Sequence, residues 1–258
     1  MRRNSKLYRR LTLLSVLVYS ATALQAQQPY QVTAEAGIGF TGGRINDTLL
    51  SSPAANGKGV HAHAAFMKTG TKRKTILEGS YTTVTYNAGH DIQQHSFSLR
   101  LSDGYNMLSK KNKYFSLYEG YMISTQGAYS PGNAAQQYSW SSLNAVGWYQ
   151  SLQYVSGKDR LSFDIRVPLA GVVYRPPAVA VSGSKDFDRG LNSMYSNPAF
   201  ASLHNNQAVD ISLQYTRMIS SHTGLSVQYN FNYQKWKGEN PLTRSGQTFG
   251  LAATYRFH

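Results

Sequence analysis

The sequence contains no cysteine among its 258 residues. This absence excludes a disulfide scaffold, a thiolate zinc site, a cysteine nucleophile and a lipid anchor on an N-terminal cysteine. Charged residues are scarce, at 15%, whereas aromatic residues reach 12% and include 19 tyrosines, a composition that argues against disorder. Mean hydropathy is −0.40 and only one long apolar run is present, which excludes a polytopic helical membrane protein.

Acidic residues are also few. The sequence has 12 of them and 26 basic residues, which gives a formal net charge of +14. Five of the basic residues lie within residues 1–10, ahead of an apolar run from Leu11 to Leu24 that ends in small and polar residues. This order predicts a signal peptide over residues 1–26, cleaved after Ala26 or, as a second choice, after Ala23; an N-terminal membrane anchor is the alternative. Removal of the signal leaves a charge of 21 − 12 = +9.

Behind the signal, apolar residues recur at every second position instead of at helical spacing, most clearly over residues 225–233. Ten candidate strands of this kind follow one another, and most are ~9–15 residues long. Strands in soluble domains usually have ~5–6 residues, whereas tilted membrane-crossing strands need ~9–11. We therefore expect lipid on the apolar face, a polar interior, and interfacial girdles that include Trp140, Trp148 and Trp236.

The connections between the candidate strands form two sets. On the side of the termini, which we call periplasmic, they cover 69–72, 103–112, 155–159 and 219–222; on the opposite side they cover 41–58, 87–91, 126–136, 175–206 and 236–245. Except for 87–91 the second set is longer, which is typical of bacterial outer-membrane barrels. Over residues 27–258 we predict an all-β, antiparallel, up-and-down transmembrane barrel of about ten strands, with eight or twelve as alternatives and a long external loop at 175–206.

The final strand alternates up to the penultimate residue. It resembles the terminal strand of bacterial outer-membrane β-barrels, although His258 follows the last aromatic residue. With the signal and the loop pattern, the chain resembles small outer-membrane β-barrel proteins of Bacteroidota. The resemblance implies a Gram-negative outer membrane, contact with its lipid, and recognition by the barrel assembly machinery of a signal strand formed by Phe249, Leu251, Tyr255 and Phe257.

Much of the basic charge belongs to the predicted periplasmic turns. The two main clusters are Lys72, Arg73 and Lys74, and Lys110, Lys111 and Lys113. Such turns meet anionic lipid head groups, and docking of a periplasmic partner is the alternative. Nucleic acid is excluded as a partner because the clusters are short, lack interleaved aromatic residues and are exported.

Strand parity places a set of ionisable side chains in the interior, where a paired network is expected because an unpaired buried charge is costly. The set comprises Glu35, Glu78, Arg100, Glu119, Asp164, Arg166, Asp210 and Arg256. His61 and His63 share the same face and fit the role of polar filler. They could coordinate a metal ion, but the sequence offers no third ligand beside them. Neither a metal nor another cofactor is therefore predicted.

These observations favour a non-enzymatic integral outer-membrane protein. It either passes small polar solutes through a narrow channel or presents loops to the outside. One alternative is a hydrolase at the external rim that uses His61, His63 and Asp210, since ten strands is also the size of the omptin proteases, which the chain does not otherwise resemble. Another alternative is a barrel component of a transport or secretion assembly.

Overall fold

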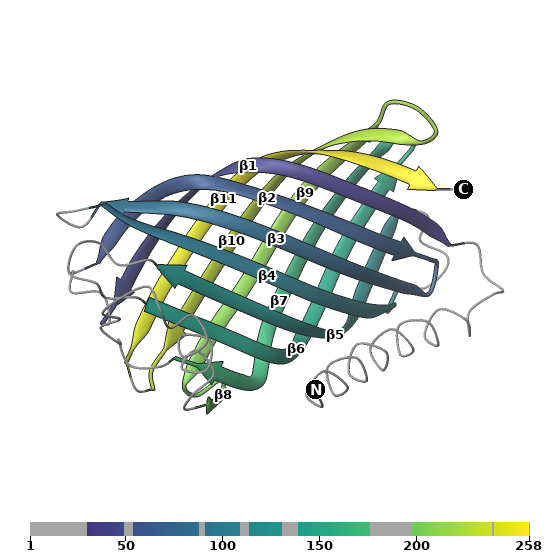
Figure 1. Ribbon diagram of the computed structural model, residues 1–258. Coiled ribbons are helices and arrows are strands. Elements are labelled where there is room, and N and C mark those ends of the chain that lie inside the picture. Colours follow the sequence, from purple (N-terminus) through teal and green to yellow (C-terminus); the bar gives the residue numbers. More distant parts are fainter. Residues whose placement is uncertain are drawn as a thin grey trace, which may run out of the picture. The chain divides into compact units, whose positions relative to one another are not determined.

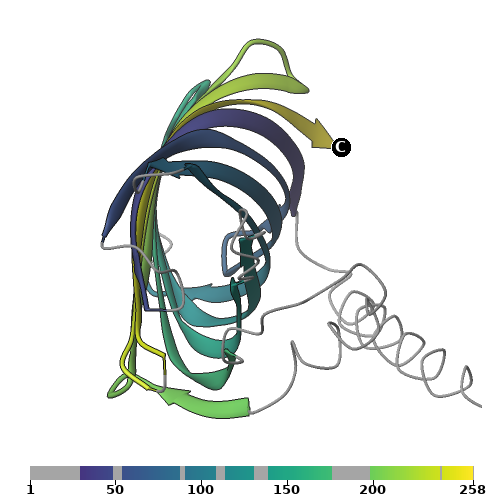
Figure 2. The same ribbon diagram turned by 60° about the vertical axis from the view of Figure 1, so that its left-hand side comes forward.

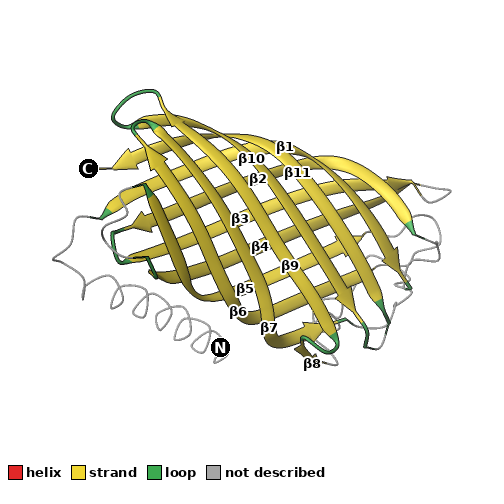
Figure 3. Ribbon diagram, turned by 180° about the vertical axis from the view of Figure 1, so that it is seen from behind, coloured by secondary structure: helices red, strands yellow, loops and turns green. Residues whose placement is uncertain are grey.

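The structure is a computed structural model that describes residues 30–48, 54–87, 91–108, 114–130, 139–175, 198–238 and 240–257. Every regular element in these ranges is a β-strand (Figure 3). Within the same ranges no helix is long and apolar enough to cross a bilayer. In chain order the strands are β1 (Gln31–Asp47), β2 (Ala55–Thr69), β3 (Arg73–Asn87), β4 (Asp91–Asn106), β5 (Phe115–Ser130), β6 (Ser139–Ser156), β7 (Asp159–Tyr174), β8 (Pro198–Ser202), β9 (Asn206–Met218), β10 (Thr223–Trp236) and β11 (Leu242–Phe257).

All strands except β8 form one closed antiparallel barrel (Figure 1). Neighbours in sequence pair from β1 to β7, β7 then pairs with β9, and β9, β10 and β11 follow in order. The barrel closes where β1 pairs with β11 over almost its whole length, from Val32 opposite Phe257 to Asp47 opposite Leu242. Figure 2 shows the strands curving around an enclosed interior. The predicted antiparallel barrel of ten strands is confirmed.

β8 lies in a segment that the sequence analysis assigned to the loop 175–206. It pairs with residues 170–174 of β7, while β9 pairs with residues 159–166 on the same edge. Between these stretches lies Pro168, which has no backbone N–H to donate, and the register against β6 also shifts at Val146 and Gly147. The connection is therefore shorter than predicted, and residues 176–197 lie outside the described part of the chain.

The two faces of the wall differ as the alternation predicts. Large apolar side chains point outward and are exposed, among them Ile38 at 73% and Phe40 at 79%. Opposite positions on the same strands are buried or half-buried and mainly polar, as with Thr33, Glu35 and Thr41. An apolar outer band around a polar interior is the distribution of a membrane-spanning barrel.

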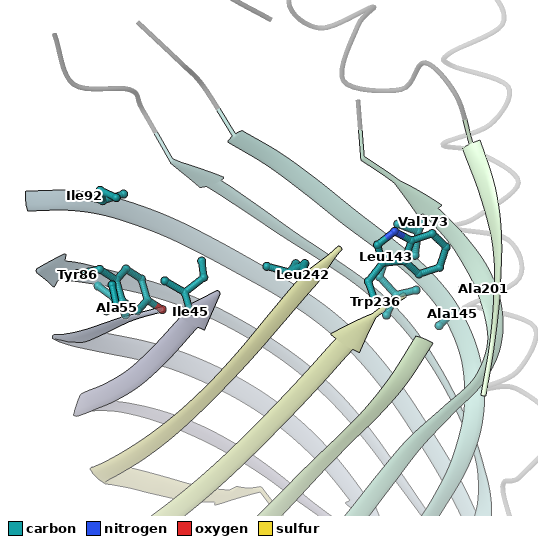
Figure 4. Close-up of a cluster of buried hydrophobic side chains, with 11 residues drawn as sticks. Ile45, Ala55, Tyr86, Ile92, Leu143, Ala145, Val173, Ala201, Trp236 and Leu242 are labelled. Carbon is teal, nitrogen blue, oxygen red and sulfur yellow. The ribbon is translucent and has the colours of Figure 1, made fainter. Parts of the chain in front are cut away.

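The external end of the interior is lined by an apolar cluster that we call the external collar. Figure 4 shows Trp236, Leu143 and Val173 together, with Ile45, Ala55 and Tyr86 on the other side of Leu242. The prediction that Trp236 belongs to an interfacial girdle is wrong, since even positions of β10 face inward and the side chain is buried. The full collar consists of Ile45, Ala55, Val84, Tyr86, Ile92, Leu143, Ala145, Val173, Ala201, Trp236 and Leu242.

Candidate functional site in the barrel interior

Buried side chains fill the periplasmic half of the interior. We call this filling the periplasmic plug and define it by Met67, Ile76, Met122 and Tyr149, which pack together, with Lys74, Ser151 and Asp164 beside them. Met122, Tyr149 and Ser151 have no exposed surface, and Lys74 is 1% exposed. Because these residues come from β2, β3, β5, β6 and β7, the plug ties opposite walls of the barrel together.

Lys74 is the charged centre of the plug. Its Nζ donates to Ser151 Oγ at 2.8 Å and to Asp164 Oδ1 at 3.4 Å. β3 and β7 are not neighbours in the sheet, so this ion pair crosses the lumen. A buried ammonium is tolerable only with such partners, and Lys74 is therefore a structural cation of the interior.

A chain of ion pairs continues from the plug toward the external half. Arg166 Nη2 lies 3.5 Å from Asp164 Oδ2 and 3.3 Å from Glu78 Oε2. Glu78 also lies 3.8 Å from Arg100 Nη1, whose Nη2 donates to Asp210 Oδ2 at 2.7 Å. Lys74, Arg100 and Arg166 thus balance Glu78, Asp164 and Asp210, three positive charges against three negative ones.

A second group surrounds Glu35 on the opposite wall. One carboxylate oxygen accepts hydrogen bonds from Gln214, from Ser226 at 3.2 Å and from Thr254 at 3.1 Å. The other lies 3.3 Å from His63 Nε2, while Gln228 Nε2 lies 2.9 Å from His63 Nδ1. This carboxylate links five strands, β1, β2, β9, β10 and β11, and both ring nitrogens of His63 have a hydrogen-bond partner.

The structure places all the predicted lumen residues inside except Glu119. Even positions of β5, such as Tyr118 and Met122, are the buried ones, so Glu119 lies on the outer face. There its Oε1 accepts a hydrogen bond from Trp148 Nε1 at 3.0 Å. The prediction for Glu119 is wrong because aromatic residues occur on both faces of β5, so the sequence does not show which face points inward. Arg256, at an even position of β11, faces inward.

The side chains of the first basic cluster, Lys72, Arg73 and Lys74, do not all lie at the turn as predicted. Lys74 points into the lumen instead of toward head groups or a partner. Arg73 lies on the outer face, where Nε and Nη2 each donate to the carboxylate of Asp103 at 2.7 Å and the guanidinium stands over the ring of Tyr105. Only Lys72 of this cluster is exposed at the turn itself. Residues 110, 111 and 113 lie outside the described residues, as do residues 1–26.

The residues proposed for a rim hydrolase do not assemble into a catalytic group. His61 and His63 stack with ring centroids 5.7 Å apart, and His61 Nδ1 lies 2.8 Å from Thr82 Oγ1. Asp210 is held by Arg100, and no hydrogen bond or ion pair among the described residues links it to either histidine. Within the same residues no cluster of three His, Asp or Glu side chains is arranged to hold a metal ion.

A polar cavity lies between the ion-pair chain and the external collar. Its volume is about 150 Å³, and its lining includes Glu78, Arg100, Asp210, Arg244 and Tyr86. Arg244 was missed by the sequence analysis because the predicted connection 236–245 included it, whereas β11 begins at Leu242. Asp47 and Arg175 were also placed in predicted connections, 41–58 and 175–206. They form a buried ion pair at the external end, where Asp47 ends β1 and Arg175 directly follows β7, and these two strands are not adjacent.

Comparisons with known proteins agree with this architecture. No known protein family and no curated protein matches the chain in sequence. The crystal structure of outer membrane protease OmpT from Escherichia coli matches with a TM-score of 0.52 and 7% identity, over 90% of this chain and 99% of that chain. The chain has the fold of an outer-membrane β-barrel.

Two other solved structures match with lower scores. The translocator domain of autotransporter NalP from Neisseria meningitidis has a TM-score of 0.43 at 10% identity, covering 98% of both chains. Neisserial surface protein A has a TM-score of 0.39 at 10% identity, covering 88% of this chain and 97% of that one. The activity of each of these proteins is a property of that protein.

Proposed function

We propose that this chain is a non-enzymatic outer-membrane protein that is closed to passive diffusion and acts at its external face. The proposal includes export with removal of residues 1–26 and an origin among the small barrels of Bacteroidota. Of the two roles that the sequence left open, channel and loop-presenting protein, the interior favours the second. The observation that carries this choice is the periplasmic plug, in which Met122, Tyr149 and Ser151 have no exposed surface.

The physical argument rests on what a solute would have to displace. A ten-stranded barrel is only slightly wider than eight-stranded barrels, whose side chains fill the interior. A polar solute crossing the plug would have to separate the Lys74–Asp164 pair and open the contact between Met122 and Tyr149. Separating a buried ion pair without replacement costs about 3–5 kcal/mol, so the closed state prevails.

Conductance across a planar lipid bilayer tests the proposal. We expect the refolded protein to insert without producing conductance steps. The double variant Met122→Ala/Tyr149→Ala removes the packed centre of the plug and should produce discrete steps. Its matched control is Ile123→Ala/Leu152→Ala, which shortens two exposed, lipid-facing side chains on the same strands, β5 and β6.

Heat-modifiable gel mobility shows whether each variant is folded before it is measured. Conductance steps from the unaltered protein would refute closure, and so would steps from the control pair equal to those of the plug variant. The enzyme hypothesis receives no support from the interior, because Asp210 is committed to Arg100 and His63 to Glu35.

A further inference from the structure

Small residues line part of the wall of the cavity above the ion-pair chain. Gly43 of β1 and Gly246 of β11 are paired across the strand interface, and both line the cavity. A Cβ atom at Gly246 would stand 3.0 Å from the side chain of Asn232, and one at Gly43 would stand 2.9 Å from a backbone oxygen of Ser245. A side chain at either position would have to displace these neighbours, so the wall of the cavity requires glycine here.

The size of the cavity matches a small solute. A volume of about 150 Å³ holds on the order of ten water molecules, at roughly 10–15 Å³ of the same measure for each. Besides the charged residues, the lining consists mostly of hydroxyl and amide groups, including Ser80, Ser96, Asn230 and Asn232. Such groups donate and accept hydrogen bonds, which suits a ligand with several hydroxyl groups.

The charges that line the cavity do not balance. Arg100 and Arg166 are paired within the chain of ion pairs that also includes Lys74, and that chain is neutral. Asp47 and Arg175 form a separate pair at the external end. Arg244 lines the same cavity, is partly exposed, and makes no hydrogen bond or ion pair with the described residues. Asp210 and Asp47 lie close enough to interact with it electrostatically, but each is already paired with another arginine.

We propose that this cavity binds a small organic anion with several hydroxyl groups, a sugar acid or a hydroxycarboxylate, and that Arg244 receives its carboxylate. A guanidinium presents two parallel N–H groups to a carboxylate, which gives both charge complementarity and orientation. Tyr86, close enough to Arg244 for the two groups to interact electrostatically, adds a hydroxyl at the same end of the cavity. The side chains of Asn230 and Asn232 are placed to contact the hydroxyl groups.

The proposal deepens the proposed function, since binding at the external half is what a barrel closed at the other half can do. The two claims fail separately. Conductance reports on the periplasmic plug, and ligand affinity reports on the cavity. A conducting protein that still binds the anion would overturn closure alone, and a closed protein that does not bind it would overturn the ligand assignment alone.

Calorimetric titration of the folded, full-length barrel in detergent micelles tests the assignment with three matched sugars. Glucuronate, glucose and glucosamine share a pyranose ring and carry a negative charge, no charge and a positive charge. We expect glucuronate to bind about tenfold or more tightly than glucose, because a charge-assisted hydrogen bond contributes roughly a tenfold to hundredfold gain in affinity. Glucosamine should bind most weakly.

Substitution at Arg244 should remove that order. Arg244→Gln is expected to weaken glucuronate binding about tenfold or more and to leave glucose within about twofold, while Arg244→Lys keeps part of the preference. The control is Arg44→Gln, which removes one positive charge from the neighbouring strand β1, where the side chain is exposed on the outer face. It should leave all three affinities within about twofold.

A third variant tests the role of the free volume of the cavity without changing its charge. Ser96→Leu introduces an apolar side chain into the cavity and should weaken glucuronate and glucose together. Failure of the unaltered protein to bind glucuronate, equal affinity for the three sugars, or a preference that survives Arg244→Gln would each overturn the proposal. Heat-modifiable mobility confirms the folded state of every variant before titration.

Discussion

The two halves of the barrel interior are lined by the same ten strands yet are built in opposite ways. In the periplasmic half, large side chains and paired charges meet across the lumen, as Lys74 does with Asp164 and Met122 with Tyr149. In the external half, Gly43, Gly246 and short polar side chains line a cavity, and Arg244 makes no hydrogen bond or ion pair with the described residues. The packed half stabilises the barrel, and the half with the cavity is where we propose that a ligand binds.

The difference also shows why charge alone does not identify a site. The six charges of the ion-pair chain form one balanced set, so their presence is explained by stability. Arg244 in the external half belongs to no such set, and it faces a cavity.

The largest effect is expected where a plug charge loses its partner. Asp164→Asn leaves the buried Lys74 ammonium with Ser151 alone, and we expect it to lower the free energy of unfolding by about 3–5 kcal/mol. Urea unfolding in lipid, followed by heat-modifiable mobility, measures the change. Asp159→Asn is the control, because its pair with Arg217 is exposed and contributes only about 0–1 kcal/mol. Equal losses in the two variants would contradict the structural role of the plug pair.

An intermediate effect is expected at the Glu35 group. Ser226→Ala removes a buried hydroxyl that lies within hydrogen-bond distance of Glu35, Thr216 and Thr254. The carboxylate keeps Gln214 and Thr254 as donors, so the expected loss is about 1–2 kcal/mol in the same unfolding assay. A loss as large as that of Asp164→Asn would mean that the two groups contribute equally and would remove the distinction between them.

The smallest effect is expected in the cavity. Ser96→Ala removes a hydroxyl that faces open space and makes no hydrogen bond with the described residues, and we expect a change within about 0.5 kcal/mol. The same unfolding curves measure it. A loss above about 1 kcal/mol would show that the external half is packed like the plug, and the contrast between the halves would then be wrong.

The sequence predicted the strands well because alternation survives wherever one face meets lipid. The pattern identifies the inward residues over most of β10 and β11, although the prediction begins β11 after residue 245 and the strand begins at Leu242. It fails at Glu119, where apolar and aromatic residues occupy both faces, and at Trp236, where an apolar collar replaces the polar interior near the mouth. It also assigned Lys74 to a turn, because a basic run beside a turn does not reveal which of its members begins the strand and points inward.

By itself, the sequence determined the class, the strand count and the lipid-facing surface, since period-two hydrophobicity is a local property of the chain. Only the tertiary structure decided which interior charges are satisfied. Lys74 and Asp164 are 90 residues apart in the sequence, and Arg100 and Asp210 are 110 residues apart. A local pattern does not reveal such pairs, which closure of the barrel brings together. The same closure leaves Arg244 facing a cavity, because neutrality and free space inside a barrel depend on side chains that meet across the lumen.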